Sequence, residues 1–307
     1  MRILFVGAVD FSRHCLEEIL QRKSNVVGVF TLSRENAYIS SDYADLEAVA
    51  SAYGVPTYHI HKINDEQTVG LIRFLNPHII FVFGFSQLIS KEILDIPPMG
   101  CIGTHPALLP RNRGRHPLIW ALVEGLTESG LTFFYIDEGI DSGDILWQKP
   151  FLITLEDDAG TLYQKIKCLA SEAIEEFLPQ LAQGNAPRVP QDHSKANYWR
   201  KRTEGDGEID WFTSTFQVNN LIRALTSPYV GAHTFLEGHR MVIWHSRLIS
   251  ESPLETLGVR TTPGEVVAET SDGILVRTGD GLIELVHWEL PREARLTLGS
   301  CLGRLSV

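Results

Sequence analysis

The stretch Arg2-Ile3-Leu4-Phe5-Val6-Gly7-Ala8 opens the chain and sets its fold class. This apolar run ends at Asp10 with no small-residue cleavage site after it, so it indicates a buried first strand rather than a signal peptide. Residues Phe11 to Leu20 carry apolar side chains at helical spacing, and Val26 to Thr31 is again apolar and β-branched. A strand, a helix and a second strand at this spacing predict a crossover unit of a parallel sheet.

The same alternation continues through the first half of the chain. Helices are predicted at Leu46–Ala52, Val69–Leu75, Pro117–Glu124 and Thr161–Leu181, and strands at Val55–Ile60, Ile79–Phe83, Gly100–His105 and Leu131–Ile136. The pattern predicts an α/β fold: a Rossmann-like, mostly parallel sheet with helices on both faces.

The second half has a different character. Residues Pro187 to Gly207 are rich in Pro, Asn, Lys, Arg and Gly and lack an apolar period, which is typical of a linker between domains. After a helix at Phe216–Leu225, short alternating strands predict a small antiparallel β-barrel of the OB type. We therefore expect an N-terminal catalytic domain at 1–188, a linker at 189–205 and a C-terminal barrel domain at 206–307.

Composition narrows the class of protein. The 307 residues are 44% hydrophobic and 21% charged, ordinary values for a globular chain, and the net charge is −11. Such a charge disfavours nucleic-acid binding. The four cysteines are far apart, so we expect no disulfide framework. His59 and His61 have no third ligand at a fitting spacing, so we expect no metal. No apolar run spans a bilayer, so we expect no membrane partner and a cytoplasmic location.

Common catalytic signatures are missing from the sequence. The turn Gly7-Ala8-Val9-Asp10 is not the G-x-G-x-x-G phosphate cradle, and no G-x-x-x-x-G-K-[ST] occurs. Residues Gly84 to Leu88 resemble a nucleophile elbow without its closing glycine, so a catalytic Ser86 is disfavoured.

One region concentrates groups able to do chemistry. It reads Gly-Cys-Ile-Gly-Thr-His-Pro-Ala-Leu-Leu-Pro-Arg-Asn-Arg-Gly-Arg-His-Pro from Gly100, followed later by Asp-Glu-Gly-Ile-Asp-Ser-Gly-Asp-Ile from Asp137. A strand that delivers His105 to its carboxyl end, beside a loop with Asp141, predicts a His–Asp pair for proton transfer. On the residues alone, a plain turn and a structural His105 remain equally open.

These two blocks resemble the folate-dependent formyltransferase family, and most closely its sugar-nucleotide N-formyltransferases. A third block, from Asp206 to Trp211 and from Ile222 to Ala232, looks like the start of the family's C-terminal domain. The resemblance implies transfer of the formyl group of N10-formyltetrahydrofolate, bound as a cosubstrate, to an amine. It assigns the family's catalytic His to His105 and its Asp to Asp141, while the family's Asn falls at Gly103.

The resemblance also implies where the folate binds. The expected contacts are Gln87, Leu88 and Ile89, the turn Leu108, Leu109 and Pro110, Arg115, and the loop Asp137, Glu138, Gly139 and Ile140.

Gly103 departs from the family pattern. It lies on the same side of its strand as His105, so Thr104 between them cannot replace the missing Asn. Losing an oxyanion donor typically costs about 3 kcal/mol or more. Three outcomes follow: an ordered water or a backbone N–H takes the role in the space that the Asn would fill, His105 carries more of it, or the protein is a folate-binding homologue with weak or no catalysis.

Charge bears on the acceptor. The stretch from Ser33 to Leu46, where the family's tRNA enzymes have a basic insertion, is short and acidic here. We therefore expect a nucleotide-linked amino sugar and no nucleic acid, with Arg111, Arg113 and Arg115 holding either phosphates or the folate's glutamate tail. The sequence is compatible with a homodimer and leaves the oligomeric state open. The alternatives are a methionyl-tRNA formyltransferase and a hydrolase of the formyl donor.

Overall fold

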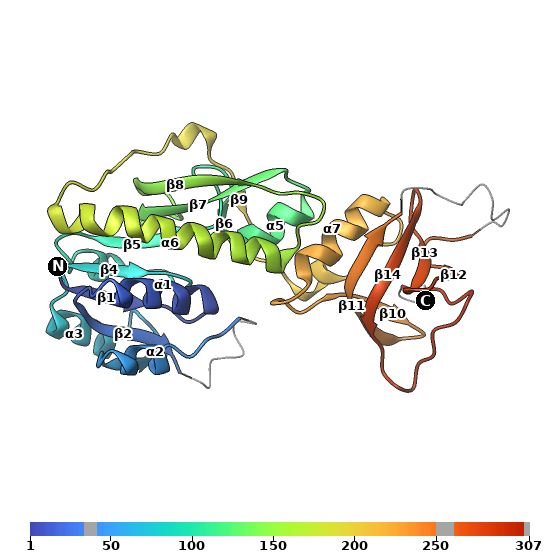
Figure 1. Ribbon diagram of the computed structural model, residues 1–307, viewed down its shortest axis with the longest axis horizontal. Coiled ribbons are helices and arrows are strands. Elements are labelled where there is room, and N and C mark those ends of the chain that lie inside the picture. The colour runs from blue at the N-terminus through green and yellow to red at the C-terminus, as the bar shows by residue number, and fades with distance from the viewer. Residues whose placement is uncertain (34–41, 250–260, 304–307) are drawn as a thin grey trace. The chain divides into compact units, whose positions relative to one another are not determined.

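A computed structural model describes residues 1–33, 42–249 and 261–303 (Figure 1). Its elements run in the order β1 (Ile3–Val6), α1 (Asp10–Gln21), β2 (Val26–Leu32), α2 (Glu47–Ala52), β3 (Thr57–Ile60), α3 (Glu66–Leu75), β4 (Ile79–Val82), α4 (Lys91–Leu94), β5 (Cys101–His105), β6 (Arg113–Gly114), α5 (Pro117–Val123), β7 (Glu128–Tyr135), β8 (Ile145–Leu152), α6 (Ala159–Gln183), β9 (Tyr198–Trp199), α7 (Thr215–Leu225), β10 (Ala232–Leu236), β11 (His239–Leu248), β12 (Val266–Glu269), β13 (Ile274–Arg277) and β14 (Leu282–Glu289). The acidic stretch from Ser33 to Leu46 lies largely outside the described residues.

The chain divides into two compact units. The first unit comprises residues Met1–Pro117, Glu128–Leu152 and Tyr163–Arg200, and the second comprises Leu118–Thr127, Ile153–Leu162 and Lys201–Val307. The first unit therefore includes most of the segment that the sequence marks as a linker.

The first unit is built on one seven-stranded sheet of order β3-β2-β1-β4-β5-β7-β8. Strands β1 to β5 pair in parallel, and β7 and β8 are antiparallel, which confirms the predicted mostly parallel sheet. Strand β8 was not predicted. It contains Pro150 and is half exposed at the sheet edge, where a proline costs no ladder hydrogen bond and the apolar period is weak.

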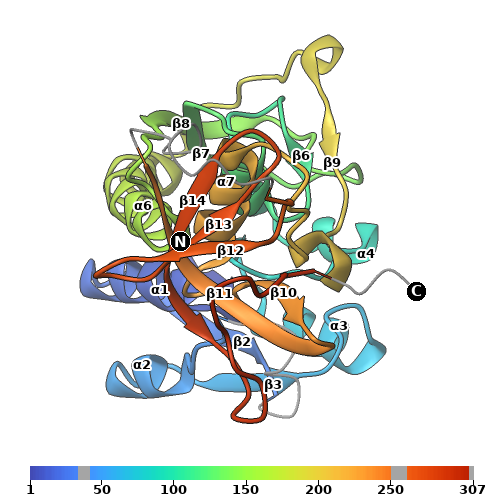
Figure 2. The ribbon, with the colours of Figure 1, turned by 90° about the vertical axis from the view of Figure 1, so that its right-hand side faces the viewer.

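Helices cover both faces of this sheet, as predicted. The side chains of Phe81 in β4 and of Phe83 just after it stack on one face, and the ring of Phe81 contacts Phe177 of α6. Ile80 and Val82 lie on the other face, in one buried cluster with Ile72 of α3 and other apolar residues. Figure 2 shows α1 and α6 on one side of the strands and α3 and α4 on the other.

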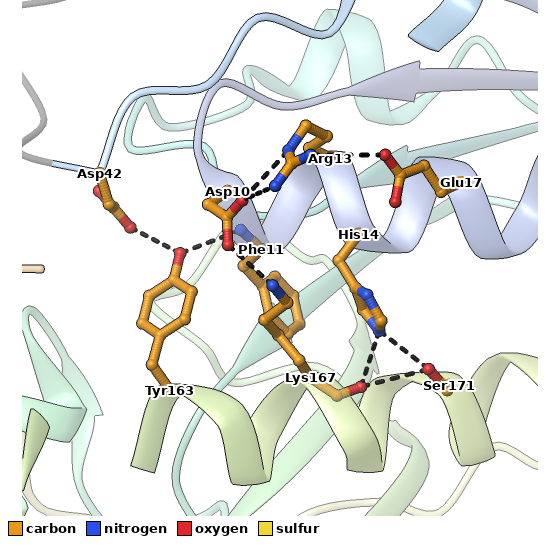
Figure 3. A network of polar contacts seen from close by, with 9 residues as sticks. All are labelled: Asp10, Phe11, Arg13, His14, Glu17, Asp42, Tyr163, Lys167 and Ser171. Carbon is orange, nitrogen blue, oxygen red and sulfur yellow. Dashed lines mark hydrogen bonds and ion pairs between the residues drawn. The ribbon is translucent and has the colours of Figure 1, made fainter. Parts of the chain in front are cut away.

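A polar network joins α1 to α6 at the carboxyl end of β1 (Figure 3). Lys167 Nζ lies 2.9 Å from Asp10 Oδ2, Arg13 pairs with the same carboxylate, and the Tyr163 hydroxyl accepts from Phe11 N and donates to Asp42. Burial raises the pKa of Asp10, but the hydrogen bonds from Arg13 and Lys167 outweigh burial and leave that pKa below its usual value.

The second unit carries a five-stranded antiparallel sheet of order β10-β11-β14-β13-β12. The short segment Cys301–Leu302 forms bridges at both edges of this sheet, with Leu236 at the end of β10 and with Glu265 just before β12. Pairing at both edges agrees with the predicted small antiparallel barrel.

Candidate active site

His105 is the last residue of β5, at the carboxyl edge of the sheet. Because β1 pairs with both β2 and β4, the strand order reverses close to this edge, which is where open α/β sheets bind ligands. The side chain is only 4% exposed. Its Nε2 lies 2.7 Å from the carbonyl oxygen of Asn112, and because a carbonyl only accepts, Nε2 must donate.

Asp141 lies opposite the other ring nitrogen. Its Oδ2 is 3.5 Å from His105 Nδ1 and accepts a 2.8 Å hydrogen bond from the backbone N–H of Gly114. The Asp141 backbone is left-handed, with φ of 50°, and its side chain is about one-fifth exposed, whereas that of His105 is buried. The structure therefore brings the predicted pair together, with a proton-accepting nitrogen facing a carboxylate that solvent can reach.

The surroundings of Gly103 correct one expectation. A Cβ added at Gly103 would lie 3.0 Å from Ile136 Cγ1 and 3.1 Å from Phe134 Cζ. The expected space for an ordered water or another donor is therefore filled by apolar carbon. Phe134 stands directly opposite Gly103 in the β5–β7 pairing, which explains the close contact.

The predicted folate loop 87–89 is tied to its neighbours through Gln87 and Arg115. The Gln87 side chain accepts from Ile63 N and donates to the His61 carbonyl, so its amide is engaged within the protein. Arg115 Nη1 donates to the Ser86 carbonyl at 2.8 Å, and Leu88 is 72% exposed. Ile89 packs against the buried cluster between the sheet and α3.

The turn at Leu108, Leu109 and Pro110 is partly buried. Leu109 is buried, its N–H donates to Thr132 Oγ1, and its carbonyl accepts from the Gln148 amide. The peptide bond between Leu109 and Pro110 is cis.

In the loop that begins at Asp137, the acidic side chains bind protein groups. The Asp137 carboxylate accepts from Gly139 N and from the Ser142 hydroxyl, and Glu138 pairs with Lys91 at 2.7 Å. The Glu138–Lys91 pair places this loop beside the start of α4. Ile140 is half exposed.

Arg113 does not fit the phosphate-binding role considered for it. It is 1% exposed and donates to Gln191 Oε1 at 2.6 Å and to the Tyr198 hydroxyl at 2.9 Å. The guanidinium is thus enclosed by protein groups. Of the three arginines in this loop, Arg111 is exposed and Arg115 is half-buried.

Sequence reasoning missed the backbone groups that hold the pair. The Asn112 carbonyl and the Gly114 N–H come from the loop and short strand β6, and β6 pairs with β9 of the predicted linker. Gly114 has φ of 104°, and a Cβ there would lie 2.3 Å from the Trp199 carbonyl. The glycine of the Arg-Gly-Arg pattern is the sequence feature that could have indicated this contact, because only glycine fits such a position.

Comparison with known families agrees with this architecture. The model of the formyl transferase family matches residues 1–178, and that of the formyl transferase C-terminal domain matches residues 201–304. The chain belongs to the formyl transferase family. It is therefore an enzyme of the formyltransferase class, and the two family models together account for most of its length.

Individual relatives extend the comparison. The methionyl-tRNA formyltransferase of Alkaliphilus oremlandii is 31% identical over 298 residues, which cover 96% of this chain and 94% of that protein. An N-formyltransferase from Helicobacter canadensis, solved with folinic acid and dTDP-3-aminofucose, has a TM-score of 0.67 at 18% identity and covers 92% of this chain and 98% of that one. HypX from Aquifex aeolicus, solved with tetrahydrofolic acid, has a TM-score of 0.68 at 20% identity over 94% of this chain and 44% of that one.

The described residues hold neither a cluster of metal ligands nor a helix suited to a membrane. Within residues 1–33, 42–249 and 261–303, no group of three or more His, Cys, Asp and Glu side chains is placed to hold a metal ion. In the same part of the chain, no helix has both the length and the apolar character needed to cross a membrane.

Proposed function

We propose that this enzyme transfers a formyl group from N10-formyltetrahydrofolate to a primary amine, with His105 and Asp141 as its catalytic residues. The observation that carries the proposal is the 3.5 Å approach of Asp141 to His105 Nδ1 at the carboxyl edge of the sheet. The donor, when bound, supplies a formyl carbon that the amine attacks. The new C–N bond forms, the bond from formyl carbon to N10 breaks, and N10 leaves with a proton.

The chain's own residues manage the proton that the amine loses. His105 Nε2 is committed to the Asn112 carbonyl, so Nδ1 is the nitrogen free to take a proton. Asp141 Oδ2 faces that nitrogen and stabilises the imidazolium. The Gly114 N–H, bound to the same oxygen, fixes the direction of the carboxylate.

The residues proposed for the folate fit a flat, partly apolar ligand. Leu88 and Ile140 are exposed apolar side chains on two loops, 86–89 and 137–141. Lys91 follows the first loop and binds Glu138 of the second, which sets the loops side by side. Because Gln87 and Asp137 use their side chains within the protein, backbone groups are left to bind the polar edges of the pterin.

For the acceptor, we propose a small amine such as a nucleotide-linked amino sugar. Residues 201–307 hold ten Lys and Arg against fourteen Asp and Glu. Several of these arginines are already engaged: Arg223 donates to the carbonyls of Thr154 and Asp157, Arg240 pairs with Glu204, and Arg247 with Asp272 and Glu284. An RNA ligand requires a basic surface, so these charges favour a small acceptor.

Methionyl-tRNA is the second candidate acceptor. Its support is the relatives that match this chain over nearly its whole length at 31–33% identity and carry the name methionyl-tRNA formyltransferase. The C-terminal family domain is present here as well.

One assay separates the candidates. The protein is incubated with N10-formyltetrahydrofolate and either a panel of nucleotide amino sugars or initiator methionyl-tRNA, and the products are analysed by mass for one added formyl group. We expect formylation of an amino sugar, and at least about 10²-fold slower formylation with the His105→Ala control. Formylation of the tRNA alone would select the second candidate, and release of formate without an acceptor would show a hydrolase. Transfer to neither acceptor would refute the proposal.

A further inference from the structure

Gln191 is a buried amide in an otherwise exposed run of the chain. Its side chain is 6% exposed, whereas Val189 is 54% exposed and Asp192 is also exposed. It was predicted as part of a linker. A polar side chain buried among exposed neighbours contributes little apolar packing, so its hydrogen bonds explain its burial.

All the hydrogen-bonding groups of this amide reach residues around the catalytic pair. Nε2 donates to the carbonyl of Asp141 at 2.9 Å and to that of Gly143 at 2.6 Å, and Oε1 accepts from Arg113 at 2.6 Å. Because Arg113 has only donors, it fixes which end of the amide faces it, so the two N–H groups must face the Asp141 loop.

The chain reaches this place through a short antiparallel bridge. Val189 and Ile145 exchange both backbone hydrogen bonds, at 2.8 and 3.0 Å, and this places Gln191 beside the loop that precedes β8. Farther along, Asn197 binds both the N–H and the side chain of Asn112, whose carbonyl accepts from His105. The segment therefore touches the supports of both catalytic side chains.

The Asp141 loop needs such a support. Asp141 has a left-handed backbone, with φ of 50°, which Asp adopts more readily than most side chains but still at a cost in free energy, so contacts that hold the turn stabilise it. The two donors of Gln191 grip the turn at Asp141 and at Gly143, and Gly114 N–H holds the carboxylate itself. A carboxylate that supports an imidazolium must be held in place before the reaction.

We propose that Gln191 is a positioning residue that acts through Asp141, so that the segment between the two family domains completes the active site. This inference rests on the proposed function of the His105–Asp141 pair. Gln191 touches no reacting atom. It sets the place and direction of the carboxylate that does.

The test compares three variants of the full chain. Gln191→Leu removes all three hydrogen bonds at similar size. Gln191→Glu keeps an acceptor for Arg113 but turns a carboxylate oxygen toward the two carbonyls. Asp192→Asn is the control, because the Asp192 side chain is exposed and its hydrogen bonds and ion pair within the described part of the chain go to Ser194 and Lys195 of its own turn.

Two measurements are made on each variant. Amide hydrogen exchange over residues 137–145 reports the loop without any need for activity. We expect about tenfold faster exchange there in both Gln191 variants, with the rest of the first unit unchanged. For formyl transfer we expect kcat to fall on the order of 10²-fold, with KM for the acceptor nearly unchanged and the control like wild type.

A double variant asks whether Gln191 acts through Asp141. In an Asp141→Asn background, Gln191→Leu should cost no further kcat, because the group that it positions has already lost its charge. An additive loss, unchanged exchange over 137–145, faster exchange across the whole unit, or full activity of Gln191→Glu would each overturn the inference. A wild-type protein that formylates no acceptor would refute the proposed function instead, and the exchange measurement would still show whether Gln191 holds the loop.

Discussion

Replacing Gly103 by Asn restores the amide that the family carries on this strand, yet we expect the change to be harmful. Gly103 is buried between Val82 and Phe134 of the neighbouring strands. A Cβ added at Gly103 would lie 3.0–3.2 Å from side-chain carbons of Ile136 and Phe134. Overpacking a well-packed site costs about 1–3 kcal/mol. An unpaired amide in that apolar environment costs about 1–3 kcal/mol more.

The two costs together predict that Gly103→Asn destabilises the protein by about 2–6 kcal/mol, which lowers the melting temperature on the order of 10 °C. Thermal and urea unfolding of Gly103→Ala and Gly103→Asn separate the two costs, because Ala adds only the Cβ. A double variant with Ile136→Ala opens the space, so we expect it to be more stable than the sum of the single changes predicts. Formyl transfer should fall in the single Asn variant.

Either of two results would refute this reasoning. If Gly103→Asn unfolds at the wild-type temperature and turns over faster, the face of β5 must be open to a side chain and the missing donor must limit the wild-type rate. If the Ile136→Ala background gives no recovery, the contacts measured at Gly103 do not explain the loss.

Three other predictions concern the site, the fold and the acceptor. His105→Ala and Asp141→Asn should each lower kcat by about 10²-fold or more in a protein that still folds, and the double variant should be little worse than either; near-normal turnover in a single variant would contradict their assignment. Because folding lowers the pKa of Asp10, its ionised carboxylate stabilises the fold at any pH above the pKa that Asp10 has in the unfolded chain. This stabilisation is lost as the pH falls through the pKa of Asp10 in the folded protein. Asp10→Asn weakens the hydrogen bonds from Arg13 and Lys167, so it should cost about 1–2 kcal/mol at neutral pH, and in urea unfolding its difference from wild type should shrink as the pH falls below the usual carboxyl pKa. Arg73→Gln removes an exposed ion pair with Glu92 and should change the stability little. Filter binding at physiological salt should show no affinity for initiator tRNA tighter than about 10⁻⁶ M, and tight, salt-sensitive binding would favour the tRNA acceptor.

The helices of the first half were predictable because each buries one periodic face, and the central strands because they are apolar on both faces. In β4 the run of apolar residues is continuous, as expected for a parallel strand covered on both faces, and α6 follows its apolar stripe from Ala159 to Gln183. Strand β8 was not predicted, because an edge strand that contains Lys149 and Pro150 has no regular pattern of apolar residues. The periodicity of apolar residues reflects which side chains are buried, so exposed elements are hard to predict from the sequence.

The candidate pair was predictable for a different reason. Alternation correctly put Gly103 on the same face as His105, and the order of motifs placed Asp141 on the loop after the adjoining strand. What fills the face of Gly103 was not predictable, because Ile136 and Phe134 arrive there only through the antiparallel register of β5 with β7. The register depends on how two strands pair, so it cannot be predicted from the sequence of either strand alone.

The supports of the pair lie still farther from any local pattern. Asp141 is held by Gly114 N–H and by Gln191, and the hydrogen bond from Gln191 spans 50 positions of the chain. A single side-chain hydrogen bond between residues so far apart in the sequence produces no periodic pattern and no characteristic spacing. A polar run such as 189–199 is therefore interpreted as a linker. The structure supplies the missing criterion, which is a buried polar side chain in an exposed segment. Gln191 satisfies it, and its partner Arg113 is likewise buried; the two bind each other beside the Asp141 loop.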